Sequence, residues 1–183
     1  MKINTFLAEG FEETEAIAVI DLLRRANFNV NLISITEKIE VNGGHNIKVI
    51  ADSTLSKTNL ADADAIFLPG GGLGVENLSK SQKILDIVKE FSQLGKYIIA
   101  ICAAPVVLEK AGVIANKKVT SFPGMKEKLP SIASYLEDSV VIDGKIITSR
   151  GVGTAIDLGL KIVEIFKGKD ESEKLRKSVV YRI

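Results

Sequence analysis

A short, almost entirely apolar run, Tyr97–Ile101, constrains the fold of this chain more than any other stretch. Such a run is typical of a strand buried on both faces, as in a parallel sheet covered by helices on each side. Residues 106–111 predict a helix, and Gly112 closes it. Cys102 therefore falls where a central strand turns into a helix, and the two alanines that follow it permit a sharp turn.

Strands and helices alternate along the rest of the chain. Alternating or continuous apolar runs predict strands, and apolar residues at helical spacing predict helices. The predicted strands are 3–8, 28–35, 65–68, 97–101 and 119–122, with hairpins over 41–50 and 140–149; the predicted helices are 12–26, 81–94 and 154–166, followed by a charged, solvated segment at 167–177. This order predicts βαβ units in one doubly wound α/β domain over residues 1–183, with a mainly parallel sheet and small β-hairpin additions.

The composition excludes several classes of function. Lys and Arg number 24 and Asp and Glu number 23, so a net charge of +1 offers no excess of basic residues for nucleic acid. The single cysteine excludes an internal disulfide. We expect no signal peptide, because residues 3–7 read as a strand and not as a long apolar segment, and no apolar run approaches the roughly 18 residues of a membrane span. We expect a cytoplasmic protein with neither a membrane nor a nucleic-acid partner.

Three segments follow predicted strands and carry polar or small residues: 9–15, 69–72 and Cys102. The carboxyl ends of parallel strands meet at one edge of the sheet, where ligands bind, so this convergence favours a functional Cys102. The start of a helix beside the sulfur would favour the thiolate over the thiol. The alternative is a buried cysteine that serves as a small apolar side chain.

Glu12 and Glu15 both project onto the apolar stripe of the first predicted helix. A carboxylate at the helix start can accept hydrogen bonds from free N–H groups, but Glu15 lies one turn further in and needs a partner. Burial would raise its pKa, so a protonated Glu15 could donate a hydrogen bond to a thiolate or act as a general acid and base. The alternative is that Glu15 only complements the helix dipole.

Other candidate groups are weaker. The glycines at 70–72 could present amides as an oxyanion hole or form a tight turn alone, and their spacing matches neither a P-loop nor a dinucleotide fingerprint. His45, the one histidine, is expected to be a polar turn residue rather than a catalytic base. One cysteine, one histidine and scattered carboxylates show no characteristic metal-ligand spacing. We expect no metal and no cofactor.

Four motifs together resemble those of the ThiJ/PfpI superfamily: AEGFEETE at 8–15, LPGG at 68–71, AICAAP at 100–105 and TSRG at 148–151. Within it, they are most similar to the branch of the parkinsonism-associated protein deglycase and the bacterial ThiJ/YajL proteins. The resemblance covers nearly the whole chain. It implies a flavodoxin-like three-layer α/β/α sandwich, a single domain of the class I glutamine amidotransferase-like kind, and a homodimer.

The resemblance also implies roles for individual residues. Cys102 would be a reactive cysteine at a strained elbow, a protonated Glu15 would hydrogen-bond its sulfur, and the N–H groups of Gly71 and Ala103 would hold an oxyanion or sulfinate. Two positions depart from the family pattern. Ala103 stands where protease-like and chaperone-like branches carry histidine, and Phe122 stands where the close branch carries one. An intracellular protease with a cysteine–histidine dyad is therefore not expected.

Two functions fit Cys102 and Glu15. As a redox sensor, a low-pKa Cys102 thiolate would be oxidised to a sulfinate. As an enzyme, the thiolate would add to a small dicarbonyl such as methylglyoxal, and Glu15 would move the proton in a glutathione-independent glyoxalase or deglycase reaction. We favour protection against oxidative and carbonyl stress, with a small aldehyde or oxidant as the partner. A non-enzymatic sensor, a chaperone-like protein and a thiamine-biosynthesis protein are the alternatives.

The first predicted helix is apolar over most of its circumference. Ile17, Ala18 and Ile20 lie around its non-core side. An isolated domain would rarely expose such a surface, so we expect these residues to form the seam of the homodimer.

Overall fold

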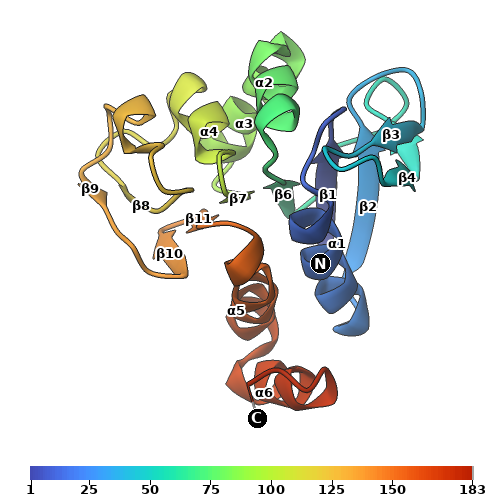
Figure 1. The fold of residues 1–183 in the computed structure, drawn as a ribbon, viewed down its shortest axis with the longest axis vertical. Coiled ribbons are helices and arrows are strands. Elements are labelled where there is room, and N and C mark those ends of the chain that lie inside the picture. The colour runs from blue at the N-terminus through green and yellow to red at the C-terminus, as the bar shows by residue number, and fades with distance from the viewer. Residues whose placement is uncertain (183) are drawn as a thin grey trace.

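The structure, a computed structural model, describes residues 1–182. Its centre is a seven-stranded sheet in the order β10-β11-β7-β6-β1-β2-β5 (Figure 1). Every pairing in it is parallel except that of the edge strand β10 with β11. The strands are β1 (Lys2–Leu7), β2 (Asn29–Ser34), β5 (Ser53–Thr54), β6 (Ala65–Leu68), β7 (Tyr97–Ile101), β10 (Val140–Asp143) and β11 (Ile146–Ser149). The mainly parallel sheet that the sequence predicts is confirmed.

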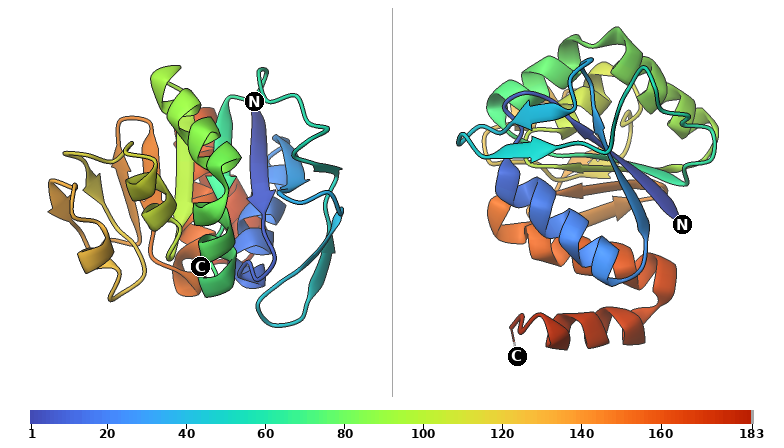
Figure 2. Two further views of the ribbon diagram at one scale, coloured as in Figure 1. Left: turned by 90° about the horizontal axis from the view of Figure 1, so that it is seen from above. Right: turned by 90° about the vertical axis from the view of Figure 1, so that its right-hand side faces the viewer.

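Helices cover both faces of this sheet, as Figures 1 and 2 show. One face carries α1 (Glu13–Arg25) and α5 (Ala155–Lys167), with α6 (Lys169–Ser178) packed outside α5; the other carries α2 (Gly72–Lys80), α3 (Gln82–Gln93) and α4 (Pro105–Lys110). The buried residues accordingly form two apolar clusters, one on each face of the sheet. This is the three-layer α/β/α sandwich that the resemblance implies.

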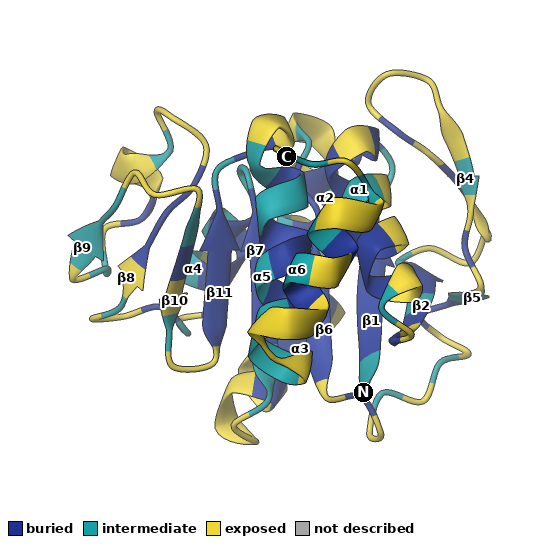
Figure 3. Cartoon of the chain, turned by 90° about the horizontal axis from the view of Figure 1, so that it is seen from below, coloured by how far each residue is buried: buried dark blue, intermediate teal, exposed yellow. Residues whose placement is uncertain are grey.

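Strand β7 explains why the run at 97–101 is so informative. Ile99 and Ile101 pack into the cluster beneath α1 and α5, whereas Ile98 and Ala100 pack into the cluster beneath the other helices. Side chains of a strand alternate between its faces, so a strand with a helical layer on each side needs apolar residues at every position. The central strands are accordingly buried along their length (Figure 3).

Two small β additions lie at opposite ends of the sheet (Figure 1). The hairpin of β3 (Glu40–Asn42) and β4 (Lys48–Ile50) is antiparallel, as predicted from its glycine turn. The pair of β8 (Lys118–Val119) and β9 (Ser134–Tyr135) is parallel and separate from the main sheet. The strand predicted over 119–122 is therefore shorter than expected. It also lies outside the main sheet, whereas a βαβ unit would have placed it within that sheet.

Two further predictions are wrong in detail. The segment 167–177 is not a solvated tail, because most of it forms α6, which buries Leu175 and donates a hydrogen bond from Ser172 Oγ to the carbonyl oxygen of Leu160 at 2.8 Å. The glycine-rich turn runs directly into α2, a helix that the sequence patterns do not predict. Among residues 1–182, no helix has both the length and the apolar character needed to cross a bilayer.

The expected dimer seam on α1 is only partly exposed. Ile17 has 42% of its surface exposed and Ala18 is half-buried, but Ile20 is buried in the core. Ile20 is buried because α1 packs against α5 as well as over the sheet. A helix with two such contacts needs a wider apolar stripe than a helix that contacts the sheet alone. Ile20 is therefore removed from the expected seam.

Candidate active site

Cys102 lies directly after β7, in the turn that leads to α4. Its φ angle is +63°, a left-handed conformation that is uncommon for a residue with a side chain and typical of strained functional turns. Two hydrogen bonds hold it there. The Cys102 N–H donates to the Ser149 carbonyl at 3.0 Å, and the Phe122 N–H donates to the Cys102 carbonyl at 2.8 Å. The sharp elbow expected from the sequence is present.

Glu15 reaches the same edge of the sheet from the first turn of α1. The helix is capped by Glu12, whose side chain accepts a hydrogen bond from the Glu15 N–H at 2.7 Å. This arrangement leaves the Glu15 side chain fully buried, with Oε2 accepting the Gly70 N–H at 3.0 Å. The other oxygen, Oε1, is buried without a hydrogen-bond partner. Such an orphaned acceptor is costly, and it is the group that protonation would satisfy.

Glycines beside Cys102 and Glu15 leave space for their side chains. A Cβ on Gly70 would overlap Oε2 of Glu15 and would lie 2.5 Å from the Cβ of Cys102. Gly71 adopts a φ of +95°, and a Cβ there would run into the backbone at Gly10 and Glu12. The turn after β6 is therefore built of glycine because the cysteine and glutamate side chains occupy the space beside it.

Burial raises the pKa of the Glu15 carboxyl to about 7, and the charge of Glu12 adds to this rise. The neighbouring Cys102 thiol and the Gly70 N–H oppose it only in part. The thiol is close enough to couple to the carboxyl, although the contact lacks the geometry of a regular hydrogen bond. Glu15 is therefore poised to take up and release a proton near neutral pH.

The Cys102 thiol differs from the low-pKa thiolate expected from its place at a helix start. Burial, followed by the charge and the contact of Glu15, raises its pKa to about 12. The N–H groups of Ala103 and Gly71 lower the pKa, as expected, but they do not outweigh burial. The resting site thus holds a neutral thiol beside a base, an arrangement that activates a nucleophile at the moment of attack.

A cavity of about 700 Å³ opens over Cys102. Its wall is formed mainly by apolar side chains, among them Phe122, Met125 and Val152. Besides Cys102, its polar side chains are few, as in most small-molecule sites: Glu12, Glu15, His45, Arg150 and Thr154. Gly71 and Ala103 also line it. The structure therefore brings together all four residues singled out from the sequence, Cys102, Glu15, Gly71 and Ala103, while their catalytic roles stay a prediction.

His45 lies in the turn of the β3–β4 hairpin, as expected, yet it also lines this cavity. Its ring Nδ1 is 2.9 Å from Glu13 Oε2, and its backbone N–H donates to Glu13 Oε1 at 2.7 Å. Among the described residues, Glu12, Glu13 and His45 form the one cluster with ligand atoms close enough for a metal ion. Both oxygens of Glu13 are already hydrogen-bonded, so the cluster fits a role in fastening the hairpin to α1.

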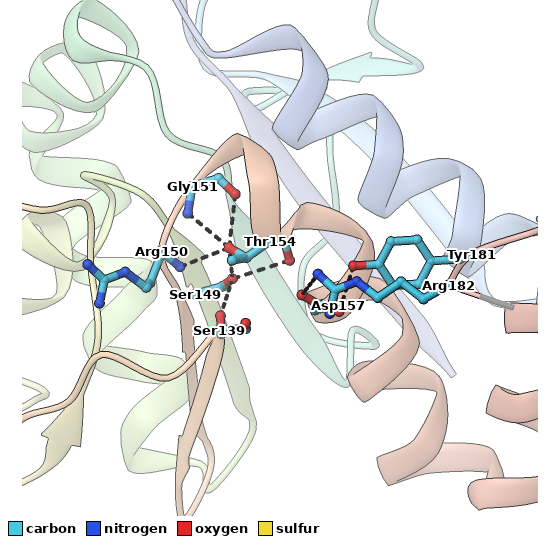
Figure 4. Close-up of polar contacts among 8 residues, drawn as sticks. All are labelled: Ser139, Ser149, Arg150, Gly151, Thr154, Asp157, Tyr181 and Arg182. Atoms are coloured by element: carbon cyan, nitrogen blue, oxygen red, sulfur yellow. Dashed lines mark hydrogen bonds and ion pairs between the residues drawn. The ribbon is translucent and has the colours of Figure 1, made fainter.

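Thr154 fixes the loop that joins β11 to α5 (Figure 4). Its Oγ1 accepts hydrogen bonds from the N–H groups of Gly151 at 3.0 Å and Arg150 at 3.2 Å, and it lies 2.8 Å from Ser149 Oγ. A Cβ on Gly151 would lie 3.6 Å from Glu15 Oε1 and 4.0 Å from Cys102 Sγ. Sequence reasoning found TSRG only as a matching motif and did not single out Thr154. The one local signal for these contacts is the residue type, because threonine side chains often bond to nearby backbone groups.

A parallel α/β/α sandwich with a cysteine at a strained strand-to-helix turn, and a buried glutamate beside it, defines a class of cysteine-centred α/β proteins. The comparisons identify the family within that class. The DJ-1/PfpI family model matches residues 1–165, and the chain belongs to this family. The resemblance read from the four sequence motifs is confirmed.

Individual relatives agree with this assignment. The protein dj-1beta of Drosophila melanogaster is 37% identical over 95% of this chain and 94% of its own length. The crystal structure of Drosophila melanogaster DJ-1beta, 36% identical, superposes with a TM-score of 0.94 and covers 100% of this chain and 98% of the solved chain. A Schizosaccharomyces pombe protein named glutathione-independent glyoxalase DJ-1 is 30% identical over 98% of both chains. Protein DJ-1 homolog B of Arabidopsis thaliana is 39% identical over 95% of this chain, which spans about two fifths (40%) of that longer relative.

Proposed function

We propose that this protein is a cysteine-dependent enzyme that converts small α-oxoaldehydes such as methylglyoxal to hydroxy acids without glutathione, and so protects against carbonyl and oxidative stress. The observation that carries the proposal is the Cys102 thiol set beside a Glu15 carboxyl with a pKa of about 7, inside a cavity large enough for such a substrate. A relative of matching length is named a glutathione-independent glyoxalase, which supports it.

The first step forms a bond between the sulfur of Cys102 and the aldehyde carbon. The Glu15 carboxylate takes the thiol proton as the sulfur attacks, which avoids a free thiolate in a site where burial disfavours one. The carbonyl oxygen gains negative charge, and we assign its stabilisation to the N–H groups of Gly71 and Ala103, which lie beside the sulfur and lower its pKa. Protonation of that oxygen by Glu15 gives a hemithioacetal and restores the carboxylate.

The second step moves hydrogen between the two substrate carbons. Glu15 removes the proton from the carbon bonded to sulfur, and the electron pair moves to the neighbouring carbonyl oxygen to give an enediolate. The hydroxyl proton on the sulfur-bearing carbon passes to that oxygen, which restores a carbonyl next to the sulfur as the second carbon is protonated. Return of the proton to the second carbon leaves a hydroxyacyl thioester on Cys102. Water then breaks the carbon–sulfur bond, giving the hydroxy acid and the free thiol. The sum for methylglyoxal is addition of one water to give lactate, with no oxidant or reductant consumed.

Release of glyoxal-type adducts from amines is a second reaction open to the same pair, because it begins with the same attack of Cys102 on an adduct carbon. A redox sensor is less favoured by the site. Oxidation of cysteine requires thiolate character, and burial together with Glu15 raises the pKa of Cys102. No contact among residues 1–182 supports the chaperone-like or thiamine-biosynthesis alternatives.

Lactate production from methylglyoxal tests the proposal in the wild type, Cys102→Ser and Glu15→Gln. Each variant removes a group that touches the reacting atoms, so we expect kcat/KM to fall by about a thousandfold or more. Glu76→Gln, a matched change on the exposed face of α2, should leave it unchanged. Activity in Cys102→Ser close to that of the wild type would rule the mechanism out.

A further inference from the structure

Phe122 is an exposed aromatic side chain at the edge of the candidate active site. About 48% of its surface is exposed, as is 48% of Val152, and both line the cavity that contains Cys102. Met125 and Pro123 continue the same wall. Large apolar side chains that are exposed together mark a surface that contacts something. Here they face a cavity rather than open solvent.

The Phe122 ring lies near the reacting groups, as distances from Gly151 show. A Cβ built on Gly151 would lie 3.6 Å from Cδ2 of Phe122, 3.6 Å from Oε1 of Glu15 and 4.0 Å from Sγ of Cys102. The ring edge, the carboxyl and the sulfur therefore surround one point. A substrate joined to the sulfur and within reach of the carboxyl therefore lies close to this ring.

The backbone of Phe122 is fixed to the cysteine turn. Its N–H donates to the Cys102 carbonyl at 2.8 Å, and its own carbonyl accepts the Met125 N–H at 3.1 Å. The loop that carries the ring is therefore hydrogen-bonded directly to the turn that carries the nucleophile. A wall held in this way can discriminate between substrates, because it does not move away to admit a poorly fitting group.

The charged groups of the cavity do not favour an anionic substituent. Arg150 lies 3.9 Å from the carboxylate of Glu137, and His45 is paired with Glu13. Each cation of the cavity thus has an acidic partner, and Glu12 adds a further carboxylate to the lining. An uncharged, apolar substituent meets the least opposition.

We propose that this cavity selects α-oxoaldehydes that carry an apolar substituent, above all an aromatic ring, and that Phe122 is the residue that determines this specificity. The inference rests on the proposed function and names its substrate class. With the aldehyde carbon bonded to Cys102 and the second carbon beside Glu15, the substituent on that second carbon lies against Phe122 and Val152. Aromatic pairs add to the free energy of apolar contact, and each methylene in such a pocket changes kcat/KM by tenfold or more.

The test compares kcat/KM for phenylglyoxal and for glyoxal in the wild type, Phe122→Ala and Phe122→Leu. We expect the wild type to favour phenylglyoxal by about tenfold or more. Phe122→Ala should lower this ratio by about fivefold or more, and Phe122→Leu should lower it less, because leucine restores apolar contact but not the ring. Leu94→Ala, an exposed apolar residue at the end of α3, is the matched control and should leave the ratio unchanged. A wild-type ratio near one, or a ratio that Phe122→Ala does not alter, would overturn the inference.

A second measurement separates failure of this inference from failure of the proposed function. Each aldehyde protects Cys102 from alkylation by iodoacetamide when it forms the hemithioacetal, and intact mass reports the protected fraction without any turnover. After normalisation to the same aldehydes with N-acetylcysteine, half-protection should require about tenfold less phenylglyoxal than glyoxal, and Phe122→Ala should reduce that difference. Absence of turnover with this preference intact would reject the enzyme alone, whereas equal protection by both aldehydes would reject the specificity.

Discussion

At the scale of single residues, Glu15 carries most of the electrostatic cost of the site. The side chain is fully buried, one oxygen has no partner, and burial raises its pKa from the ordinary value of 4.5 to about 7. A carboxyl whose pKa is higher in the folded than in the unfolded state favours folding in its protonated form. Its contribution to stability is therefore complete below pH 4.5 and is lost as the pH rises through 7.

Replacement of Glu15 by glutamine removes this pH dependence. A change in pKa from 4.5 to about 7 corresponds to about 3 kcal/mol, so the free energy of unfolding of Glu15→Gln relative to the wild type should rise by about that amount between pH 4 and pH 8. Urea unfolding of both proteins at each pH measures it. A difference between the two proteins that stays constant across this range would show that the pKa of Glu15 is the same in the folded and unfolded states.

Residue types at strand ends were enough to predict the chemical pair but not its surroundings. Cys102 and Glu15 follow two strands of a parallel sheet, and that topology alone brings them to one edge. The pKa of Cys102 could not be predicted, because it depends on how deeply the sulfur is buried and on the charge beside it. The places of His45 and Gly151 at the site depend on how loops pack, which no local pattern encodes.

At the scale of elements, the β3–β4 hairpin is fastened to α1 by Glu13. Burial opposes ionisation of Glu13, but hydrogen bonds from the His45 side chain and from the N–H groups of His45 and Ile47 together hold its pKa below the ordinary range. The same contact raises the pKa of His45. The charged pair therefore joins the tip of the hairpin to the helix that carries Glu15.

This pair predicts a pH dependence in the hairpin. Because the pKa of His45 is raised in the folded protein, its contribution to holding the hairpin is complete below its ordinary pKa of 6.5 and is lost as the pH rises through the folded value. In Glu13→Gln the pKa of His45 should fall back toward 6.5, measured by NMR titration of its ring protons, whereas Glu40→Gln on β3 should not change it. An unchanged titration in Glu13→Gln would show that the contact does not form in solution.

Helices and strands could be predicted from the sequence where burial alone determines the pattern of apolar residues. Every side chain of β7 from Ile98 to Ile101 meets one of the two apolar clusters, so its pattern is unambiguous. The sequence of the segment that forms α6 predicts a solvated segment, because few of its residues beyond Leu175 and Ser172 are buried. Ion pairs such as Arg176 with Glu173 at 2.7 Å stabilise its exposed face. Such a helix depends on packing against α5, and this contact is not visible in the local sequence.

At the scale of the whole molecule, we propose that residues 1–183 form a single domain that associates as a homodimer through the exposed face of α1. Ile17 is the large apolar residue of that helix left open to solvent. Sedimentation of the wild type should give a dimer, and Ile17→Lys should shift it toward a monomer, with Leu94→Ala as an exposed apolar control. A monomeric wild type at all accessible concentrations would contradict the proposal.

In the proposed mechanism Cys102 and Glu15 form one acid–base unit, and the coupling between them is measured by the rate of Cys102 alkylation by iodoacetamide as a function of pH. The chain has a single cysteine, so intact mass reports this site alone. Removal of the Glu15 charge should lower the pKa of the thiol, so the profile of Glu15→Gln should move to lower pH by about one unit or more while methylglyoxal turnover is lost. A variant with a more reactive thiol and no turnover is the predicted result. A profile identical to that of the wild type would show that the two groups are not coupled and would contradict the mechanism.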